Sequence, residues 1–295
     1  MKKYELTSDV LQYAGHTLHR IKALKDFDYI KAGALGGWIE SEKNLSHTEG
    51  AWISKDAIVF ENAVVCGNAK ISEQAKVYGN ANICGAAIVY GNAEVHGNAT
   101  VSGNAEVYGN TTVSGKALVS GNANIYEAAR VYRNAIVCGN AEVHGNAWVY
   151  GHACVCDWVD VYGAAKIYGD AIVFENALVC GTANIFGNAN IHGNAKVYEN
   201  ADVYGDAKVY EDAEICGNAK VHNGTDYIVF KNFWSSERYF TWTRSNNMWK
   251  VGCFYGTGEE LIKKAYADSE KSGKEYERVV RYVESMLTDK QKNLK

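Results

Sequence analysis

One hexapeptide, Ala-x-Val-x-Gly-Asn, repeats without insertion or deletion from residue 51 to residue 224. Every sixth residue from Ala51 to Ala219 is Ala except Thr111 and Val159, and the residue two places later is always Val or Ile. Within each unit, small or β-branched residues alternate with variable ones, which is the period of a strand with one buried face. Gly and Asn tolerate left-handed backbone conformations, so the Gly-Asn pair predicts a corner every six residues.

Short strands joined by regular corners predict an all-β solenoid, whose stacked turns bury a core that no single turn could bury. Three hexapeptides would make a triangular turn of 18 residues, and residues 51–224 would then form about ten such turns. At the spacing of parallel strands, the prism would be roughly 45 to 50 Å long. Ala at one inward position and Val or Ile at the next would fill its narrow axis.

The unit Val-x-Gly-Asn-Ala-x resembles the hexapeptide of left-handed parallel β-helices, in which a small residue follows an aliphatic one by four places. The resemblance covers more than half of the chain and implies a left-handed coil. It says little about function, because the fold serves acyltransferases, relatives of carbonic anhydrase and proteins with no known activity.

A narrower resemblance lies upstream, in residues 21–27, 31–33 and 36–39, with Trp52-Ile53 opening the repeats. These segments are similar to those of an uncharacterised family of bacterial and prophage hexapeptide proteins that are sometimes labelled transferases. The label rests on fold analogy alone, and none of these residues indicates a reaction.

The sequence divides into four parts: an N-terminal cap at 1–50, the repeats at 51–224, a β-meander at 225–256 and C-terminal helices at 257–295. An open β-helix exposes unpaired edges at both ends, so both ends need covering. In the first cap, Arg20 to Ala23 alternates as a short strand would, and Gly36-Gly37-Trp38 is expected to fold a large ring over the first turn.

After the repeats, residues 227–233, 238–244 and 248–254 predict three antiparallel strands. Their many aromatic residues either pack on the last turn or form a binding surface. Thr257 and Glu260 have capping-box spacing before a helical pattern that Gly273 divides into two helices. The second helix has an apolar stripe, which is expected to cover this subunit's prism or a neighbour's.

Composition narrows the range of partners and compartments. The net charge of −4 gives no global electrostatic reason for binding nucleic acid. No apolar run has the length of a membrane span, and the N-terminus lacks the apolar core of a signal peptide. The eight Cys therefore fit reduced thiols better than a disulfide framework, and we expect a cytoplasmic protein.

The variable positions sort into three outer faces because residues 18 apart stack. The face that begins at Trp52 carries mixed charges and tyrosines and is expected to face solvent. The next face stacks cations around an indole beside a tyrosine column: Arg130, Trp148 and Lys166 beside Tyr132, Tyr150 and Tyr168. This arrangement predicts a site for a small anionic aromatic ligand such as a nucleotide. The alternative is a tyrosine ladder that only stacks on itself.

The third face carries no formal charge before Lys208. Its middle contains Leu118, Ile136, Cys138, Cys154, Cys156, Ile172 and Phe174. A large uncharged surface with several thiols is not expected to face water. We predict that partner subunits of a homo-oligomer, a trimer or a dimer, cover it, or that the C-terminal helices fold back over it.

Two chemical alternatives concern histidine. His152, Cys138, Cys154 and Cys156 would be soft metal ligands if they converged, but flat strands do not wrap side chains around a tetrahedral ion. In the acyltransferases that the repeat resembles, a His near a subunit boundary is commonly the general base, and His96, His144, His152, His192 and His222 are available. His144 is the one with a carboxylate at a suggestive spacing, Glu142 on the same strand face.

The favoured interpretation is a non-enzymatic binding protein that presents an aromatic and basic surface to a small anionic ligand or a host protein. The uninterrupted repeat supports it, because the enzymes of this fold usually extrude a loop over the acceptor. We assign no catalytic residue, cofactor or metal, and we expect neither a membrane nor a nucleic-acid partner. The alternative is an acyl-CoA-dependent acyltransferase with its site in a groove between subunits.

Overall fold

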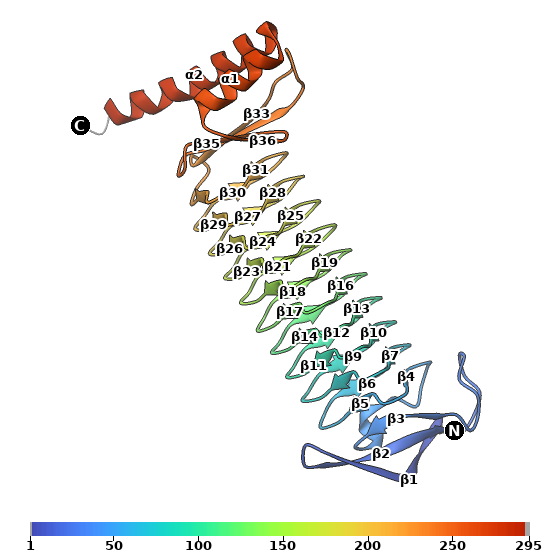
Figure 1. Ribbon diagram of the computed structural model, residues 1–295. Coiled ribbons are helices and arrows are strands. Elements are labelled where there is room, and N and C mark those ends of the chain that lie inside the picture. The colour runs from blue at the N-terminus through green and yellow to red at the C-terminus, as the bar shows by residue number, and fades with distance from the viewer. Residues whose placement is uncertain (1, 293–295) are drawn as a thin grey trace.

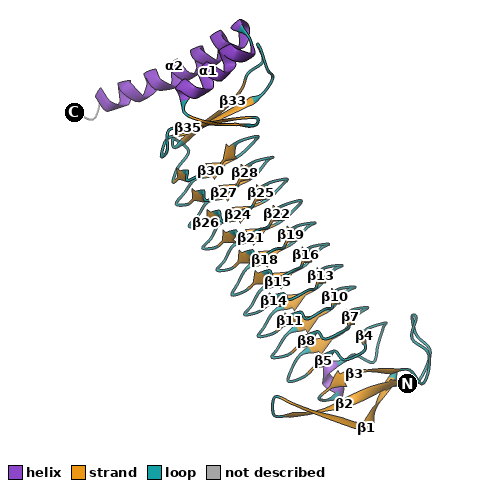
Figure 2. Cartoon of the chain, in the orientation of Figure 1, coloured by secondary structure: helices purple, strands orange, loops and turns teal. Residues whose placement is uncertain are grey.

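The computed structural model describes residues 2–292 and shows a long triangular prism (Figure 1). The repeats form a left-handed parallel β-helix of about ten turns. An antiparallel hairpin lies at its N-terminal end, and a four-stranded sheet with two helices lies at its C-terminal end (Figure 2). The predicted solenoid, with its meander and helical tail, is therefore confirmed.

Along the repeats, each side of the prism is one sheet of parallel two-residue strands, and we name each sheet by its outer face. The aromatic sheet has thirteen strands: β1 (Tyr4–Tyr13), β2 (His16–Ala23), β3 (Leu35–Ile39), β5 (Ile58–Val59), β8 (Lys76–Val77), β11 (Glu94–Val95), β14 (Thr112–Val113), β17 (Arg130–Val131), β20 (Trp148–Val149), β23 (Lys166–Ile167), β26 (Asn184–Ile185), β29 (Asp202–Val203) and β32 (Lys220–Val221). Its first two strands form the antiparallel hairpin.

The mixed sheet has ten strands: β4 (Trp52–Ile53), β7 (Lys70–Ile71), β10 (Ile88–Val89), β13 (Glu106–Val107), β16 (Asn124–Ile125), β19 (Glu142–Val143), β22 (Asp160–Val161), β25 (Leu178–Val179), β28 (Lys196–Val197) and β31 (Glu214–Ile215). The uncharged sheet has nine: β6 (Val64–Val65), β9 (Asn82–Ile83), β12 (Thr100–Val101), β15 (Leu118–Val119), β18 (Ile136–Val137), β21 (Cys154–Val155), β24 (Ile172–Val173), β27 (Asn190–Ile191) and β30 (Lys208–Val209).

The register is the one that the repeat predicts. Each strand pairs with the strand 18 residues away, as Trp148 does with Lys166. The inward Ala and Val or Ile of every turn are at most 1% exposed, and they form one continuous core along the axis.

Gly and Asn have different roles at the corners. Gly adopts the left-handed conformation, with φ of +69° at Gly103, where a Cβ would lie 2.7 Å from the carbonyl oxygen of Gly121 in the next turn. Asn instead forms ladders along the prism, since the amide of Asn104 donates to Asn122 and that of Asn122 donates to Asn140. The left-handed conformation is thus needed at the Gly position alone.

The N-terminal cap differs from the prediction at Trp38. This side chain lies on the outside of the first turn, where the Arg20 guanidinium is 5.3 Å from its ring centre. Gly36 and Gly37 instead let β3 run against the chain of the first turn, since a Cβ on Gly37 would lie 2.5 Å from the Ala57 carbonyl. The large ring that is buried at this end is Trp52, which is 1% exposed and belongs to the core cluster. A 3₁₀ turn, η1 (Glu42–Asn44), links the cap to the repeats.

The predicted three-stranded meander is a four-stranded sheet, the end sheet: β33 (Tyr227–Lys231), β34 (Tyr239–Thr243), β35 (Met248–Val251) and β36 (Phe254–Gly256). The expected third strand breaks at Gly252, which adopts a φ of +57° and turns the chain back. One contact of the end sheet with the prism is the Glu214 amide, which donates to the Thr241 hydroxyl.

The two helices are α1 (Gly258–Asp268) and α2 (Glu270–Lys292). Thr257 and Glu260 form the predicted capping box. The division falls at Ser269 and not at Gly273, which lies inside α2. A side chain at Gly273 would overlap the ring of Tyr266, so glycine lets α1 pack closely against α2 there. Neither helix in residues 2–292 is long and apolar enough to span a membrane.

The helices pack on the end sheet and not on the sides of the prism. Their apolar residues Leu261, Ile262, Ala265, Tyr276, Val280 and Val283 share a separate core with Phe240, Trp242, Trp249 and Val251 of the sheet. The predicted packing on the last turn holds for Tyr227, which joins the prism core and donates a hydrogen bond to the Lys208 carbonyl. Phe240, Trp242 and Trp249 instead pack on the helices, whose apolar stripe covers the end sheet and not the prism. The predicted alternative that these helices fold back over the uncharged sheet is therefore wrong.

Candidate functional site

The structure brings together all six residues that the sequence predicts for ligand binding. Arg130, Trp148 and Lys166 occupy consecutive turns of the aromatic sheet. The Arg130 guanidinium and the Lys166 ammonium each lie 5.3 Å from the Trp148 ring centre. Beside them, the rings of Tyr132, Tyr150 and Tyr168 stack at 4.9 Å intervals. We call these six residues the aromatic-basic patch.

The cations of this patch have no carboxylate partner among the side chains of residues 2–287. Lower in the same column, Lys76 forms a 3.0 Å ion pair with Glu94. Arg130 and Lys166 form no such pair in the described chain, and neither does Arg133, whose guanidinium lies 5.9 Å from the Tyr150 ring centre. The patch therefore presents uncompensated positive charge beside half-buried aromatic rings.

A shallow cavity opens at one end of the patch. It has a volume of about 210 Å³ and is lined by Thr112, Ser114, Arg130, Tyr132 and Trp148. Its floor is formed by two small hydroxyl residues, and its wall is formed by the larger side chains of the next two turns. Thr112, Ser114 and Arg133 were not predicted. Ser114 could have been found as the small residue that interrupts an aromatic column, and Arg133 as a cation in a Gly position of the corner.

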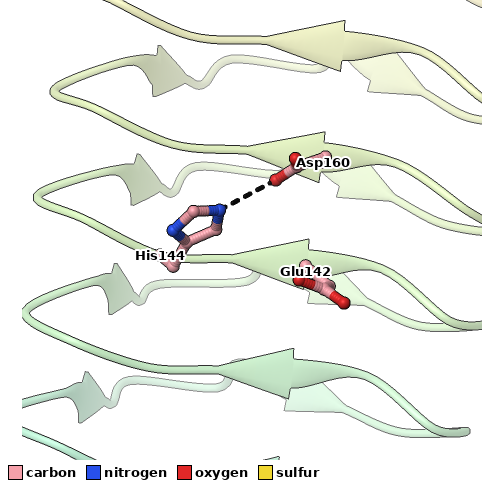
Figure 3. A group of neighbouring side chains, drawn as sticks. All are labelled: Glu142, His144 and Asp160. Atoms are coloured by element: carbon pink, nitrogen blue, oxygen red, sulfur yellow. Dashed lines mark hydrogen bonds and ion pairs between the residues drawn. The ribbon is translucent and has the colours of Figure 1, made fainter.

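The mixed sheet carries a second cluster, Glu142, His144 and Asp160 (Figure 3). The imidazole of His144 is stacked between the rings of Tyr126 and Tyr162, at 4.5 and 5.2 Å. Its Nε2 lies 3.0 Å from Asp160 Oδ1, in the next turn. The partner of His144 is therefore Asp160 and not the predicted Glu142, which accepts a hydrogen bond from the Tyr126 hydroxyl.

Burial raises the pKa of Asp160 above its usual range, and the neighbouring imidazole opposes the rise without cancelling it. A carboxylate beside an imidazole can fix its orientation and stabilise its protonated form, which is the arrangement of a general base. The second nitrogen, Nδ1, lies 3.9 Å from Glu127 Oε2. The three clustered residues also offer ligand atoms within 4.8 Å of one another, but each already engages a neighbouring side chain.

The cysteines of the uncharged sheet are not all free thiols. Cys138 and Cys156 form a disulfide between consecutive turns, which corrects the expectation of reduced thiols at these positions. Stacking places their Cα atoms 4.6 Å apart, within disulfide range. Cys154 Sγ lies 3.4 Å from Cys156 Sγ, and His152 is exposed at the corner. The disulfide removes two of the four ligands that a metal site here would need.

The remaining residues of the uncharged sheet stay accessible on this chain. Ile136 is 37% exposed and Ile172 is 43% exposed, and Leu118 and Phe174 are half-buried. Trp158, at the neighbouring corner, is 67% exposed.

Comparison with known proteins gives a distant relationship. No family model matches the sequence. Over 77 residues the chain is 34% identical to a protein of Escherichia coli strain K12 described as the uncharacterized acetyltransferase YdcK. The match covers 23% of this chain and 24% of that protein, so the chain spans about a quarter of the length of the curated relative. The protein is thus a β-solenoid with a distant relative described as an acetyltransferase.

Proposed function

We propose that the protein is a non-enzymatic binding protein whose rigid prism holds a small planar anion on the aromatic-basic patch. The observation that carries this proposal is the stack of Arg130, Trp148 and Lys166, whose two cations have no carboxylate partner in the described chain. Arg130 and Trp148 also line a cavity.

Both the anionic group and the flat ring of such a ligand have binding partners on the patch. Cations that lack a neighbouring carboxylate attract an anion, and the guanidinium of Arg130 offers a planar set of donors for a phosphate or carboxylate. The indole and the tyrosine rings offer aromatic surface for contacts with a flat ring. Because backbone hydrogen bonds hold each turn to the next, the patch is preorganised and little ordering is needed on binding.

Titration with nucleoside monophosphates tests this proposal, with tryptophan fluorescence as the signal. Binding is expected to weaken about tenfold or more in Arg130→Ala and Trp148→Ala. Lys208→Ala is the matched control, because it removes one exposed cation from another sheet and should leave binding unchanged. Equal affinity in all four proteins would contradict the proposal.

A second candidate function is acyl transfer from a thioester, with His144 as the general base. The contact between His144 and Asp160 favours it, and so does the description of the distant relative as an acetyltransferase. In this reaction, His144 would take the proton of an acceptor amine or hydroxyl as the acceptor attacks the thioester carbonyl, while the carboxylate of Asp160 stabilises the imidazolium. The carbon–sulfur bond would then break, and the departing thiolate would take the proton from the imidazolium and leave as free thiol.

Release of free thiol from acetyl-CoA in the presence of amine acceptors tests the second candidate. Turnover that disappears in His144→Ala and persists in His152→Ala would establish it and would overturn the non-enzymatic proposal. Absence of turnover in the wild-type protein, across a panel of amines and alcohols, would remove it.

We also propose that the protein assembles into a homo-oligomer, a dimer or a trimer, through the uncharged sheet. The C-terminal helices do not cover this face, and its aliphatic side chains remain exposed beside Trp158. A sheet face that carries no formal charge before Lys208 is the kind of surface that subunit contacts bury.

A further inference from the structure

The aromatic column of the aromatic sheet lacks one ring. On one side of the interruption, the rings of Phe60, Tyr78 and His96 stack at 5.1 and 4.8 Å. On the other side, a second stack starts at Tyr132 and continues through Tyr150 and Tyr168. Ser114 occupies the position between the two stacks.

The backbone shows that only one ring is missing. The amide of His96 donates to Val113, and the amide of Ser114 donates to Val131, so His96, Ser114 and Tyr132 follow one another in three consecutive turns. The two stacks are therefore separated by twice the strand spacing, about 9.6 Å. A flat ring placed midway would lie about 4.8 Å from each neighbour, which is within the range of stacked aromatic pairs.

The position is open. The cavity of about 210 Å³ lies over Ser114 and has Tyr132 in its wall. The mixed sheet has a comparable interruption at Cys180, between Tyr162 and Tyr198, but there the Tyr162 hydroxyl bonds to the thiol. No side-chain hydrogen bond within the described chain engages Ser114 in this way.

Positive charge surrounds the open position. Arg130 lines the cavity, and Lys116 and Arg133 are exposed at the adjoining corner, in the turn of Ser114 and in the next turn. Among the side chains that the structure describes, residues 2–287, none of the three forms an ion pair with a carboxylate. The hydroxyls of Thr112 and Ser114 add hydrogen-bonding groups at the floor of the cavity. A ring that carries an anionic group would complete the stack and neutralise these cations.

We infer that Ser114 marks a ring slot, in which the base of a nucleotide stacks between His96 and Tyr132 while its phosphate contacts the cations at this edge. This inference rests on the proposed binding function and specifies where the ring binds and what chemistry the ligand has.

The test compares adenosine 5′-monophosphate, guanosine 5′-monophosphate and ribose 5-phosphate as probes. The two nucleotides should bind the wild-type protein, and ribose 5-phosphate should bind more weakly because it has no ring to stack. Ser114→Tyr places the protein's own ring in the slot and should weaken nucleotide binding by about tenfold or more, the contribution of one stacked base. Ser114→Leu fills the slot without an aromatic ring and should act in the same direction.

Ser72→Tyr is the matched control, because it adds the same side chain next to Tyr90 on the mixed sheet and should leave binding unchanged. If the nucleotides bind Ser114→Tyr and Ser114→Leu as tightly as they bind the wild type, the slot is wrong while binding at the patch stands. If no nucleotide binds the wild-type protein, both the slot and the proposed function are overturned.

Discussion

The carboxylate of Glu199 accepts a 2.6 Å hydrogen bond from the backbone amide of Gly217, one turn further along the prism. Glu199 stands where most corners have Gly, and it adopts a left-handed φ of +59°. Glu61 and Glu175 form the same bond, to Gly79 and Gly193. Glutamate is thus tolerated in a strained corner because its side chain satisfies an amide of the next turn.

Replacing Glu199 separates the cost of the left-handed backbone from the gain of the hydrogen bond to Gly217. Glu199→Ala keeps the left-handed residue and loses the bond, so we expect a loss of about 1 kcal/mol in the free energy of unfolding. Glu199→Gly also loses the bond but relieves the strain, and its stability should stay close to that of the wild type. Urea denaturation measures both. Equal losses in the two variants would contradict this account of the corner.

The phenol of Tyr162 should lose its proton at a higher pH than an ordinary tyrosine. Its hydrogen bond to the Cys180 thiol raises the pKa of the phenol to about 12, compared with about 10 in an unfolded chain. The folded protein therefore keeps this proton between pH 10 and 12, where the unfolded chain loses it. The corresponding stability is complete below pH 10 and is lost as the pH rises through 12.

The ultraviolet absorbance of phenolate, compared between the wild type and Tyr162→Phe, isolates this group. In Cys180→Ala the difference signal should move toward the pH of an ordinary tyrosine. A difference signal that stays in place would show that another contact holds the proton.

Because Cys138 and Cys156 form a disulfide, these two cysteines should not react with a thiol reagent before reduction, unlike the other six. A thiol reagent added to the denatured, unreduced protein should titrate six of the eight cysteines. Cys138→Ala should lower the free energy of unfolding by about 2 to 3 kcal/mol, because the bond closes a loop of one turn. Cys84→Ala, in the same column, is the control. Eight reactive thiols before reduction would instead support the expectation of reduced cysteines.

Charge on the uncharged sheet should prevent assembly. Ile136→Lys and Ile172→Lys place cations in the middle of the face that we propose as the subunit contact. Light scattering after size exclusion should give a dimer or trimer for the wild type and a monomer for the double variant. Ile88→Lys, on the mixed sheet, should leave the mass unchanged. A monomeric wild-type protein would contradict the proposed assembly.

The sequence predicts the prism well, because the same small or β-branched residue types recur at every inward position. Ala and Val or Ile recur at every turn, and the period of 18 residues places Arg130, Trp148 and Lys166 in one column without further information. The adjacency of Cys138 and Cys156 follows from the same period, but their covalent bond does not, since stacking alone leaves the redox state open.

The predictions fail where contacts cross columns or leave the repeat. His144 meets Asp160 because the side chain reaches from one outward column to the other, in the next turn, and strand spacing alone does not specify that direction. Beyond residue 224 no period remains. The turn at Gly252 and the packing of Trp249 on α1 and α2 therefore depend on tertiary contacts that local pattern does not encode.

The prism also acts as a spacer of fixed length between two dissimilar ends, the β1–β2 hairpin and the helices on the end sheet. Each turn contacts only its neighbours, so adding or removing 18 residues changes the distance between the ends by about 4.8 Å and leaves all columns aligned. Evolution can therefore add or remove whole turns of the prism without changing the sequence of either end.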